Sequence, residues 1–263
     1  MKTSPFLTTR GRVSRLGLGT VKFGRNEVVK YPTAFDLPSD SEILDLLEIA
    51  REEGINLLDT APAYGTSEER IGTLLGSRRD DWFLMSKAGE EFEDGVSYFD
   101  FSAEWITSSV ERSLVRLRTD RLDCVLIHSD GNDREILENS GAVEALARLK
   151  EQGKILSHGI STKTVEGGRR AVTLGLDAVM ATYHPWHREE EPVLDAAAES
   201  GTAVFVKKAL ASGWFGGAED EEGDPVEKSF SFVFSHPGTT AAIVGTINPD
   251  HLRANCAALR KAG

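Results

Sequence analysis

INLLDTAPAYG, residues 55–65, runs from an apolar segment directly into a turn that carries two ionisable side chains. Residues 55–58 are typical of a buried strand, and a proline and a glycine then take the chain out of regular structure. Asp59 and Tyr64 therefore follow a strand directly, which is where α/β enzymes place their active sites. Taken alone, the stretch fits equally well an Asp that caps a turn followed by a surface Tyr. The rest of the chain has to decide between an active site and such a turn.

Short apolar runs alternate with longer amphipathic segments along the chain, which is typical of βαβ units. One helix start is marked by Ser39 with Glu42 three residues later, the spacing of a capping box. We expect strands at residues 16–20, 55–58, 82–86, 122–127, 155–160, 178–181, 202–206 and 240–244. We expect helices at residues 39–53, 67–75, 103–118, 139–152, 165–174, 190–200, 225–235 and 249–261.

This count of strands and helices decides the architecture. Eight strands with eight helices fit a (β/α)₈ barrel, the TIM barrel of the α/β class, better than a doubly wound sheet, which commonly uses five or six strands. No linker, low-complexity segment or repeat divides the sequence. We therefore expect residues 1–263 to form a single barrel domain, with residues 1–12 as a short N-terminal extension.

Composition and charge exclude several functional classes. The 263 residues include 30 basic and 42 acidic ones, and the net charge of −12 disfavours nucleic acid and anionic membrane as partners. The two cysteines, Cys124 and Cys256, lie in apolar patterns and are too few for a disulfide framework or a metal cluster. No stretch approaches the roughly 18 apolar residues of a membrane span, and the N-terminus has no signal-peptide core. We expect a soluble, cytoplasmic monomer.

Four ionisable residues lie just after the ends of three consecutive predicted strands. Asp59 and Tyr64 follow the second strand, Lys87 follows the third and His128 follows the fourth. The carboxyl ends of barrel strands meet at one mouth, so we expect these side chains to lie together. Core packing does not explain a carboxylate, a phenol, an ammonium and an imidazole in one place.

These side chains suit general acid catalysis by the tyrosine. A phenol with a pKa near about 10 is a poor acid at neutral pH unless a nearby positive charge stabilises its anion. Lys87 would supply that charge, and Asp59 would hold the ammonium and offset the cost of burying it. His128 would donate a hydrogen bond to the oxygen on which charge develops, a role whose loss typically costs on the order of a hundredfold to a thousandfold in rate.

At these residues the sequence resembles the aldo-keto reductase family, whose members carry an Asp, Tyr, Lys and His tetrad in the contexts DTAxxYG, SK and LxH. The chain has DTAPAYG, MSKAG and LIH at those places, and the resemblance extends from about residue 13 to the final helix. It implies an oxidoreductase in which Tyr64 protonates an aldehyde or ketone carbonyl while a reduced nicotinamide delivers hydride. NADP(H) is the cofactor that the resemblance favours, with NAD(H) as the alternative.

The same resemblance implies a set of cofactor contacts around the mouth. Gly19 and Thr20 end a first strand that is expected to pass close to the cofactor. The nicotinamide carboxamide would be gripped by Ser161, Thr162 and Met180, and Lys207 takes the position where relatives stack an aromatic ring. The expected pyrophosphate and adenosine-phosphate positions are Leu210, Gly213, Gly245, Thr246, Asn248, His251 and Asn255. Free amides at the start of the last helix suit an anion.

Other motifs favour simpler interpretations. The glycines in residues 17–24 lack the G-x-G-x-x-G spacing of a dinucleotide-binding turn. His184 and His187 lack further ligands at metal-binding spacing, so no metal site is expected. The acidic residues 219–224 are expected to form a solvated loop that is placed to fold over a bound cofactor. An open mouth without long substrate loops is expected, with candidate aromatic walls at Phe23, Trp105 and Trp186.

Two other functions stay open at this level. A lyase that uses Lys87 or Lys207 as a Schiff-base nucleophile would suit the same barrel, because the fold hosts many chemistries. A non-catalytic redox sensor that binds a nicotinamide nucleotide is the second alternative, because the expected carboxamide contacts depart from those of the family. All three functions involve small molecules as ligands.

Overall fold

Eight parallel strands close into a barrel in the computed structural model of the chain, which describes residues 1–6, 12–29, 31, 33–213 and 223–262. Around the ring the order is β3, β4, β5, β8, β9, β10, β11 and β12, and β12 pairs with β3 to close it. The strands are β3 Leu16–Gly19, β4 Leu57–Asp59, β5 Phe83–Ala88, β8 Cys124–His128, β9 His158–Ser161, β10 Ala178–Thr182, β11 Ala203–Lys207 and β12 Thr239–Val244. This topology confirms the predicted (β/α)₈ barrel.

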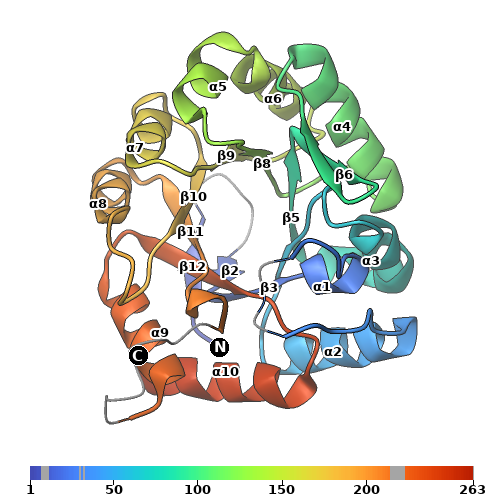
Figure 1. Cartoon of the computed structure of the whole chain (residues 1–263), viewed down its shortest axis with the longest axis vertical. Coiled ribbons are helices and arrows are strands. Elements are labelled where there is room, and N and C mark those ends of the chain that lie inside the picture. Colours follow the sequence, from blue (N-terminus) through green and yellow to red (C-terminus); the bar gives the residue numbers. More distant parts are fainter. Residues whose placement is uncertain (7–11, 30, 32, 214–222, 263) are drawn as a thin grey trace.

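Helices surround the barrel on its outside (Figure 1). In the first long one Ser39 accepts a hydrogen bond from the Glu42 amide while the Glu42 carboxylate accepts one from the Ser39 amide, which confirms the predicted capping box. The helices are α1 Val21–Gly24, α2 Asp40–Glu52, α3 Ser67–Leu75, α4 Ala103–Arg116, α5 Asp133–Asn139, α6 Ala142–Glu151, α7 Val165–Thr173, α8 Glu191–Ser200, α9 Pro225–Ser235 and α10 Pro249–Ala262. Two short 3₁₀ segments are η1 Gly76–Asp81 and η2 Ala211–Gly213. The sequence did not predict α1 or α5.

Alternation along each strand decides which side chains face the barrel interior. In β5 Phe83 and Met85 lie in an apolar cluster inside the barrel, and Lys87 continues the same row at the carboxyl end. In β11 Phe205 lies in that cluster and Lys207 continues its row in the same way. Both lysines are therefore directed towards the mouth of the barrel by the pleat of their strands.

Strands outside the barrel were not predicted, and one pair involves the N-terminus. β1 Thr3–Pro5 pairs antiparallel with β2 Arg12–Ser14. Phe6 is buried and packs edge-on against Phe83 and Phe205, with ring centroids 5.5 and 5.7 Å apart. The described part of residues 1–12, expected to be only an extension, thus forms a strand outside the barrel and contributes the core side chain of Phe6 to the barrel interior.

A β-hairpin follows β5 where the sequence predicted a plain loop. β6 Glu90–Glu93 pairs antiparallel with β7 Val96–Phe99. The turn between them is Asp94 and Gly95, both at positive φ (50° and 79°), and an Asp-Gly pair between two short runs is a known hairpin signal. The loop predicted after β5 is therefore an ordered hairpin, and the expectation of an open mouth without long substrate loops stays a prediction.

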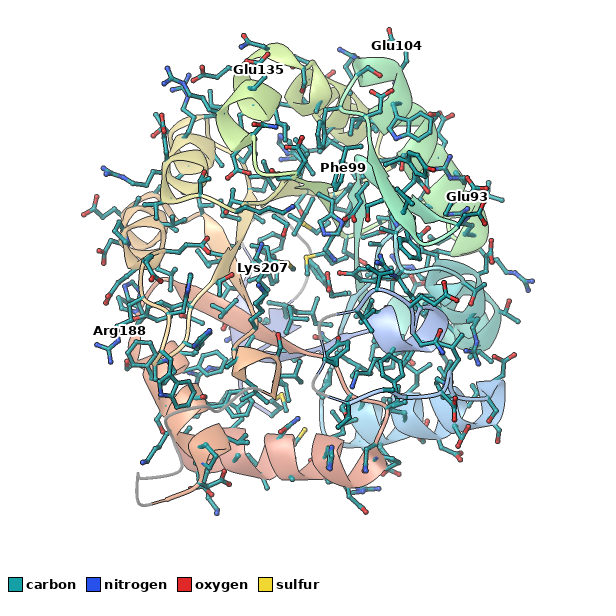
Figure 2. All side chains as sticks on the ribbon, in the orientation of Figure 1. Glu93, Phe99, Glu104, Glu135, Arg188 and Lys207 are labelled. Carbon is teal, nitrogen blue, oxygen red and sulfur yellow. The ribbon has the colours of Figure 1, made fainter. Side chains whose placement is uncertain are left out.

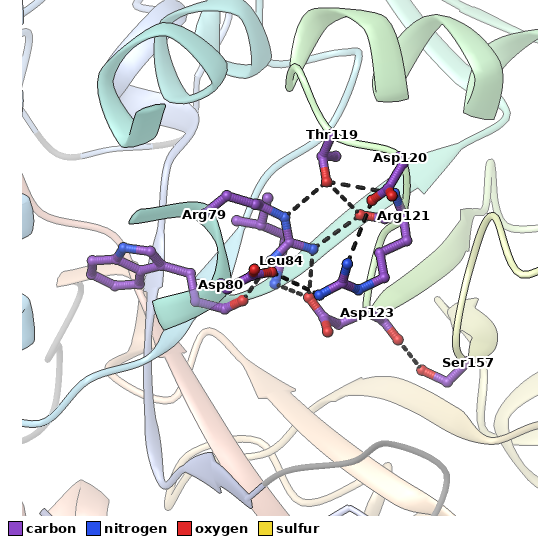
Figure 3. Close-up of polar contacts among 9 residues, drawn as sticks. Arg79, Asp80, Leu84, Thr119, Asp120, Arg121, Asp123 and Ser157 are labelled. Atoms are coloured by element: carbon purple, nitrogen blue, oxygen red, sulfur yellow. Dashed lines mark hydrogen bonds and ion pairs between the residues drawn. The ribbon is translucent and has the colours of Figure 1, made fainter. Parts of the chain in front are cut away.

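A polar network joins β5 and β8 at their amino-terminal ends (Figure 3). Asp123 accepts hydrogen bonds from the Leu84 amide at 2.8 Å and from Arg79 Nη2 at 2.9 Å. Arg79 also donates to Thr119 Oγ1 at 3.1 Å and to the Arg121 carbonyl at 2.9 Å. The side chains of Arg79 and Asp123 are only 12% and 15% exposed, so this network stabilises the end of the barrel opposite the mouth.

Both cysteines are buried and unpaired, as expected for small core residues. Cys124 lies in the cluster inside the barrel, and Cys256 packs from α10 onto its outer face. Across the described ranges, every helix is too short or too polar to cross a membrane.

Candidate active site

A buried ion pair lies at the mouth between two neighbouring strands. Asp59 ends β4 and Lys87 lies in β5, which pairs with β4. Lys87 Nζ is 2.5 Å from Asp59 Oδ1 and donates a second hydrogen bond to the Thr60 carbonyl at 2.9 Å. Burial by itself would lower the pKa of Lys87, but the charge and hydrogen bond of Asp59 overcome it and raise the pKa above its ordinary value. Lys87 is therefore a fixed ammonium at neutral pH.

Tyr64 stands beside this ion pair in the turn between β4 and α3. Lys87 Nζ lies 4.7 Å from the centre of its ring. Burial raises the pKa of Tyr64, Lys87 lowers it and Asp59 raises it again, so the net pKa lies above the ordinary value. Lys87 lowers the pKa of this phenol, as expected. Burial and Asp59 raise the pKa by more than Lys87 lowers it, so the expected increase in acidity does not result. Tyr64 therefore keeps its proton across the neutral range.

His128 ends β8 and meets Tyr64 edge-on, with ring centroids 6.2 Å apart. Its Nδ1 lies 2.8 Å from Oε2 of Glu90, although the contact is poorly aligned for a ring N–H hydrogen bond. Burial lowers the pKa of His128, and Glu90 opposes this. Burial alone would raise the pKa of Glu90, but His128 and Ser97 lower it to about 2. Glu90 is thus an ionised neighbour of the imidazole.

Sequence reasoning missed Glu90, because it belongs to the hairpin that was not predicted. Its place three residues after Lys87 and just before an Asp-Gly turn was the available signal. The Ser97 hydroxyl donates to Glu90 Oε1 at 2.7 Å, so β7 helps to hold the carboxylate in place.

Lys207 enters the mouth from the opposite wall, because three barrel strands separate β11 from β5 in either direction around the ring. Figure 2 shows its side chain directed into the barrel opening. Its Nζ donates to Ser161 Oγ at 3.1 Å and to the Thr162 carbonyl at 2.5 Å. Burial lowers the pKa of Lys207 to about 8, even though Glu190 raises it. The position where relatives are expected to stack an aromatic ring thus holds a hydrogen-bonded amine.

Several predicted cofactor contacts gather around this lysine. Ser161 and Thr162 lie at the end of β9 and hold Lys207 directly. Met180 pairs with Ser161 in register and is 3% exposed inside the barrel, where it offers an apolar floor and no polar group for a carboxamide. Leu210 and Gly213 lie in the turn after β11, where the non-glycine residues Lys208, Ala211 and Ser212 have left-handed φ values of 56°, 46° and 56°.

Other predicted contacts lie at the ends of β3 and β12, next to β11 in the ring. Gly19 ends β3, and a Cβ added there would lie 3.1 Å from Ile243 Cγ2. A Cβ added at Gly245 would lie 3.1 Å from the Tyr31 hydroxyl oxygen. Both positions are therefore closely packed, and a side chain there would crowd Ile243 or Tyr31.

Two side chains predicted to face a cofactor are engaged elsewhere. Thr20 is fully buried, and its hydroxyl donates to the Asp59 carbonyl at 2.9 Å and accepts from Ser67 Oγ at 2.9 Å. Asn248 caps α10 through Oδ1, which accepts from the amides of Asp250 and His251 at 2.8 and 3.2 Å. The expectation of free amides at this helix start is therefore wrong for these two, because the Asn248 side chain already satisfies them.

The last predicted positions lie along α10 and in the loop before it. Thr246 is 7% exposed and Asn255 is 9% exposed, while His251 is exposed. Arg253 forms ion pairs with Glu53 at 3.4 Å and with Glu52 at 3.7 Å.

The expected aromatic walls and the acidic loop have mixed outcomes. Phe23 is fully buried in the core outside the barrel, so it is not a wall of the mouth. Trp105 and Trp186 are partly exposed, and their role as walls stays a prediction.

Residues 219–222 of the acidic run lie outside the described residues, and Asp224 caps α9 by accepting from the Val226 amide at 2.9 Å. His184 and His187 face each other with ring centroids 5.6 Å apart, and the described residues contain no cluster of three metal ligands.

The family model of the aldo/keto reductase family matches residues 15–230, which span all of the barrel except its last strand and helix. The chain belongs to the aldo/keto reductase family. A solved structure of a candidate aldo-keto reductase from Pseudomonas aeruginosa is 53% identical, with a TM-score of 0.89 over 99% of this chain and 95% of that one. The family membership and this fold agree with the arrangement of the mouth described above.

Curated members of the aldo/keto reductase family are more distant. An uncharacterized oxidoreductase, YqkF, from Bacillus subtilis is 31% identical over 206 residues, which is 76% of this chain and 62% of the relative. An NADH-specific methylglyoxal reductase from Escherichia coli is 31% identical over 229 residues, which is 81% of this chain and 68% of the relative. The chain thus spans less than two thirds of the length of YqkF. Enzymes of the family use nicotinamide cofactors.

Proposed function

We propose that this chain is an NAD(P)H-dependent carbonyl reductase that converts small aldehydes or ketones into alcohols. The supporting observation is the buried Asp59–Lys87 pair next to Tyr64, a phenol whose raised pKa keeps its proton available at neutral pH. His128 lies on the other side of the phenol. Such a set has no structural need of its own, since burying an ion pair in an apolar barrel costs free energy. We propose that it acts as a monomer in the cytoplasm.

Each member of the set has a distinct role in the proposed reaction. A bound reduced nicotinamide supplies the hydride. Tyr64 donates its proton to the carbonyl oxygen, and the Lys87 ammonium stabilises the phenolate that remains. Asp59 holds Lys87 in place, and His128 is positioned beside the oxygen on which negative charge develops. Because Lys87 is held before substrate arrives, little reorganisation is needed when the charge forms.

The mouth offers donor groups that would suit a nicotinamide dinucleotide. At Gly19 and Gly245 an added Cβ would crowd Ile243 and Tyr31, so glycine keeps side chains out of these two positions. Ser161 and Lys207 offer hydrogen-bonding groups suited to a carboxamide. The residues after β11, around Leu210 and Gly213, present left-handed backbone of the kind that forms anion-binding turns.

We propose that both nicotinamide nucleotides bind and that NADP(H) is preferred. His251 is exposed on the first turn of α10, and Arg253 lies two residues further along the same helix. A 2′-phosphate would have to compete with Glu52 and Glu53 for Arg253. The Escherichia coli relative is NADH-specific, so the ratio of the two affinities is the quantity to measure.

The test combines cofactor binding with turnover. The protein is titrated with NADPH and with NADH while cofactor fluorescence is followed, and reduction of small aldehydes is then measured. Tyr64→Phe is expected to bind the nucleotide within about twofold of wild type and to lose on the order of a hundredfold or more in kcat. Tyr98→Phe, on the exposed face of β7, is the matched control and should keep full activity.

Three outcomes would contradict parts of the proposal. Failure of both nucleotides to bind at millimolar concentration would exclude the proposed reductase function. Unchanged turnover in Tyr64→Phe would show that another group donates the proton. Binding without turnover of any aldehyde would favour the redox sensor instead.

A further inference from the structure

The two lysines that enter the mouth have opposite surroundings. Lys87 donates to a carboxylate, Asp59, at 2.5 Å. Lys207 donates only to neutral oxygens, the Ser161 hydroxyl and the Thr162 carbonyl. Among the residues that the structure describes, Lys207 forms no ion pair with a carboxylate. Its side chain nevertheless lies at the mouth in the same inward row as Phe205, where ligands enter the barrel.

The hydrogen-bond partners of each lysine match a different protonation state. An ammonium has three N–H donors, whereas a neutral amine has two and keeps a lone pair. Lys87 interacts with Asp59, Thr60 and the Tyr64 hydroxyl, which suits an ammonium. Lys207 has two acceptors, so a neutral amine satisfies both and leaves its lone pair unused. The lone pair is the part of an amine that attacks a carbonyl carbon.

We propose that Lys207 is an imine-forming lysine that condenses with small aldehydes entering the mouth. The Nζ lone pair attacks the aldehyde carbon and forms a C–N bond, while the carbonyl π electrons move to oxygen, which takes one proton from the nitrogen to give a carbinolamine. The C–O bond then breaks as the nitrogen forms the C=N bond, and the hydroxyl leaves as water with the second proton of the nitrogen. One amine and one aldehyde thus give one imine and one water, without any oxidant, reductant or nucleotide. This activity goes beyond carbonyl reduction and does not depend on it.

The charges around Lys207 favour its neutral form. Burial has the largest effect and lowers its pKa, and the positive charges of Lys208 and Lys87 lower it further. Glu190 and Asp133 act in the opposite direction. At the resulting pKa of about 8, about one tenth of the side chain is the neutral amine at pH 7, against about one part in three thousand for an ordinary lysine with a pKa near 10.5. Exposed lysines therefore compete weakly for an aldehyde at this pH.

The proposal is tested by reductive trapping in the absence of nucleotide. The protein is incubated briefly with propanal and sodium cyanoborohydride at pH 7, and propylation of each lysine is measured by mass spectrometry after digestion. We expect Lys207 to be propylated at least about tenfold more than any other lysine. The trapping rate at Lys207 should rise with pH and level off above about pH 8.

Matched variants separate this site from its neighbours. Lys207→Arg should remove the dominant label, and Lys208→Arg, next in sequence, should retain it. The thermal unfolding midpoint of each variant confirms that it is folded, and the pH profile of wild-type trapping requires no variant at all. Tyr64→Phe should be labelled like wild type, so a failure of the proposed reductase does not affect this result. Labelling spread evenly over surface lysines, concentrated on Lys87, or still rising steeply above pH 9 at Lys207 would overturn the proposal.

Discussion

Glu90 sets the proton position on the imidazole of His128. A carboxylate 2.8 Å from Nδ1 favours the proton on that nitrogen, so the neutral ring leaves Nε2 without one. A hydrogen bond from Nε2 to a substrate oxygen then requires the imidazolium, whose pKa burial lowers from its ordinary value. The imidazolium is lost as pH rises through that lowered pKa, so wild-type kcat/KM should decline at pH values below the ordinary imidazole pKa of about 6.5.

Glu90→Gln should remove most of this decline. A glutamine amide donates to Nδ1 and lets the neutral ring carry its proton on Nε2. Glu91→Gln is the matched control, because Glu91 is the next residue of β6 and pairs with Arg112 instead. The measurement is kcat/KM for one aldehyde between pH 5 and 9. An identical profile in Glu90→Gln and wild type would show that Glu90 only supports the hairpin.

At the scale of elements, the mouth and the opposite end of the barrel have separate tasks. The side chains that we propose to be functional lie at the carboxyl ends of β4, β5, β8 and β11, whereas the Arg79–Asp123 network lies at the amino-terminal ends of β5 and β8. The residues that stabilise the barrel therefore lie at one end of its axis, and the residues that we propose for catalysis lie at the other.

Asp123→Ala should destabilise the barrel without changing turnover. It leaves the Leu84 amide and the largely buried Arg79 guanidinium without their shared acceptor, which costs about 2–4 kcal/mol of unfolding free energy. Urea denaturation measures this loss, and kcat should stay within about twofold of wild type. Asp120→Ala is the control, because its carboxylate is 87% exposed and lies 3.5 Å from Arg121; we expect at most about 0.5 kcal/mol there. A loss below about 1 kcal/mol in Asp123→Ala would contradict the role of the network.

At the scale of the whole molecule, buried histidine makes stability depend on pH. Burial, His187 and Lys208 lower the pKa of His184 to about 4. The unfolded chain, with an ordinary pKa near 6.5, binds more protons than the folded chain between about pH 6.5 and 4. Stability is therefore complete above this window and is lost as pH falls through it, by about 1–3 kcal/mol for His184. Glu90, with a pKa of about 2, extends the loss below pH 4.5.

The test compares unfolding free energies by urea at pH 6.5 and 4.5. We expect wild type to lose stability between these two values and His184→Asn to lose clearly less. His251→Asn removes an exposed histidine from α10 and should follow wild type. An equal loss of unfolding free energy between pH 6.5 and 4.5 in wild type and His184→Asn would show that His184 is accessible to protons in the folded state.

The sequence by itself determined the barrel, the starts of its long helices and the strand ends that carry Asp59, Lys87 and His128. These features depend on local patterns: the two-residue period of a strand, the capping box at Ser39 and the order of strands and helices along the chain. Because consecutive parallel strands lie side by side, residues at their carboxyl ends meet without further information.

Only the tertiary structure decided the partners of these side chains. Glu90 reaches His128 through a hairpin, and Lys207 finds neutral acceptors 46 and 45 residues away in β9 and just after it. The same is true of Asn248, whose side chain caps α10 and does not face the mouth. Such contacts depend on the closure and register of the whole barrel, and these set which charge stands next to which titratable group. For this reason the sequence placed two lysines at the mouth, but only the fold separated a lysine paired with a carboxylate from one held by neutral oxygens.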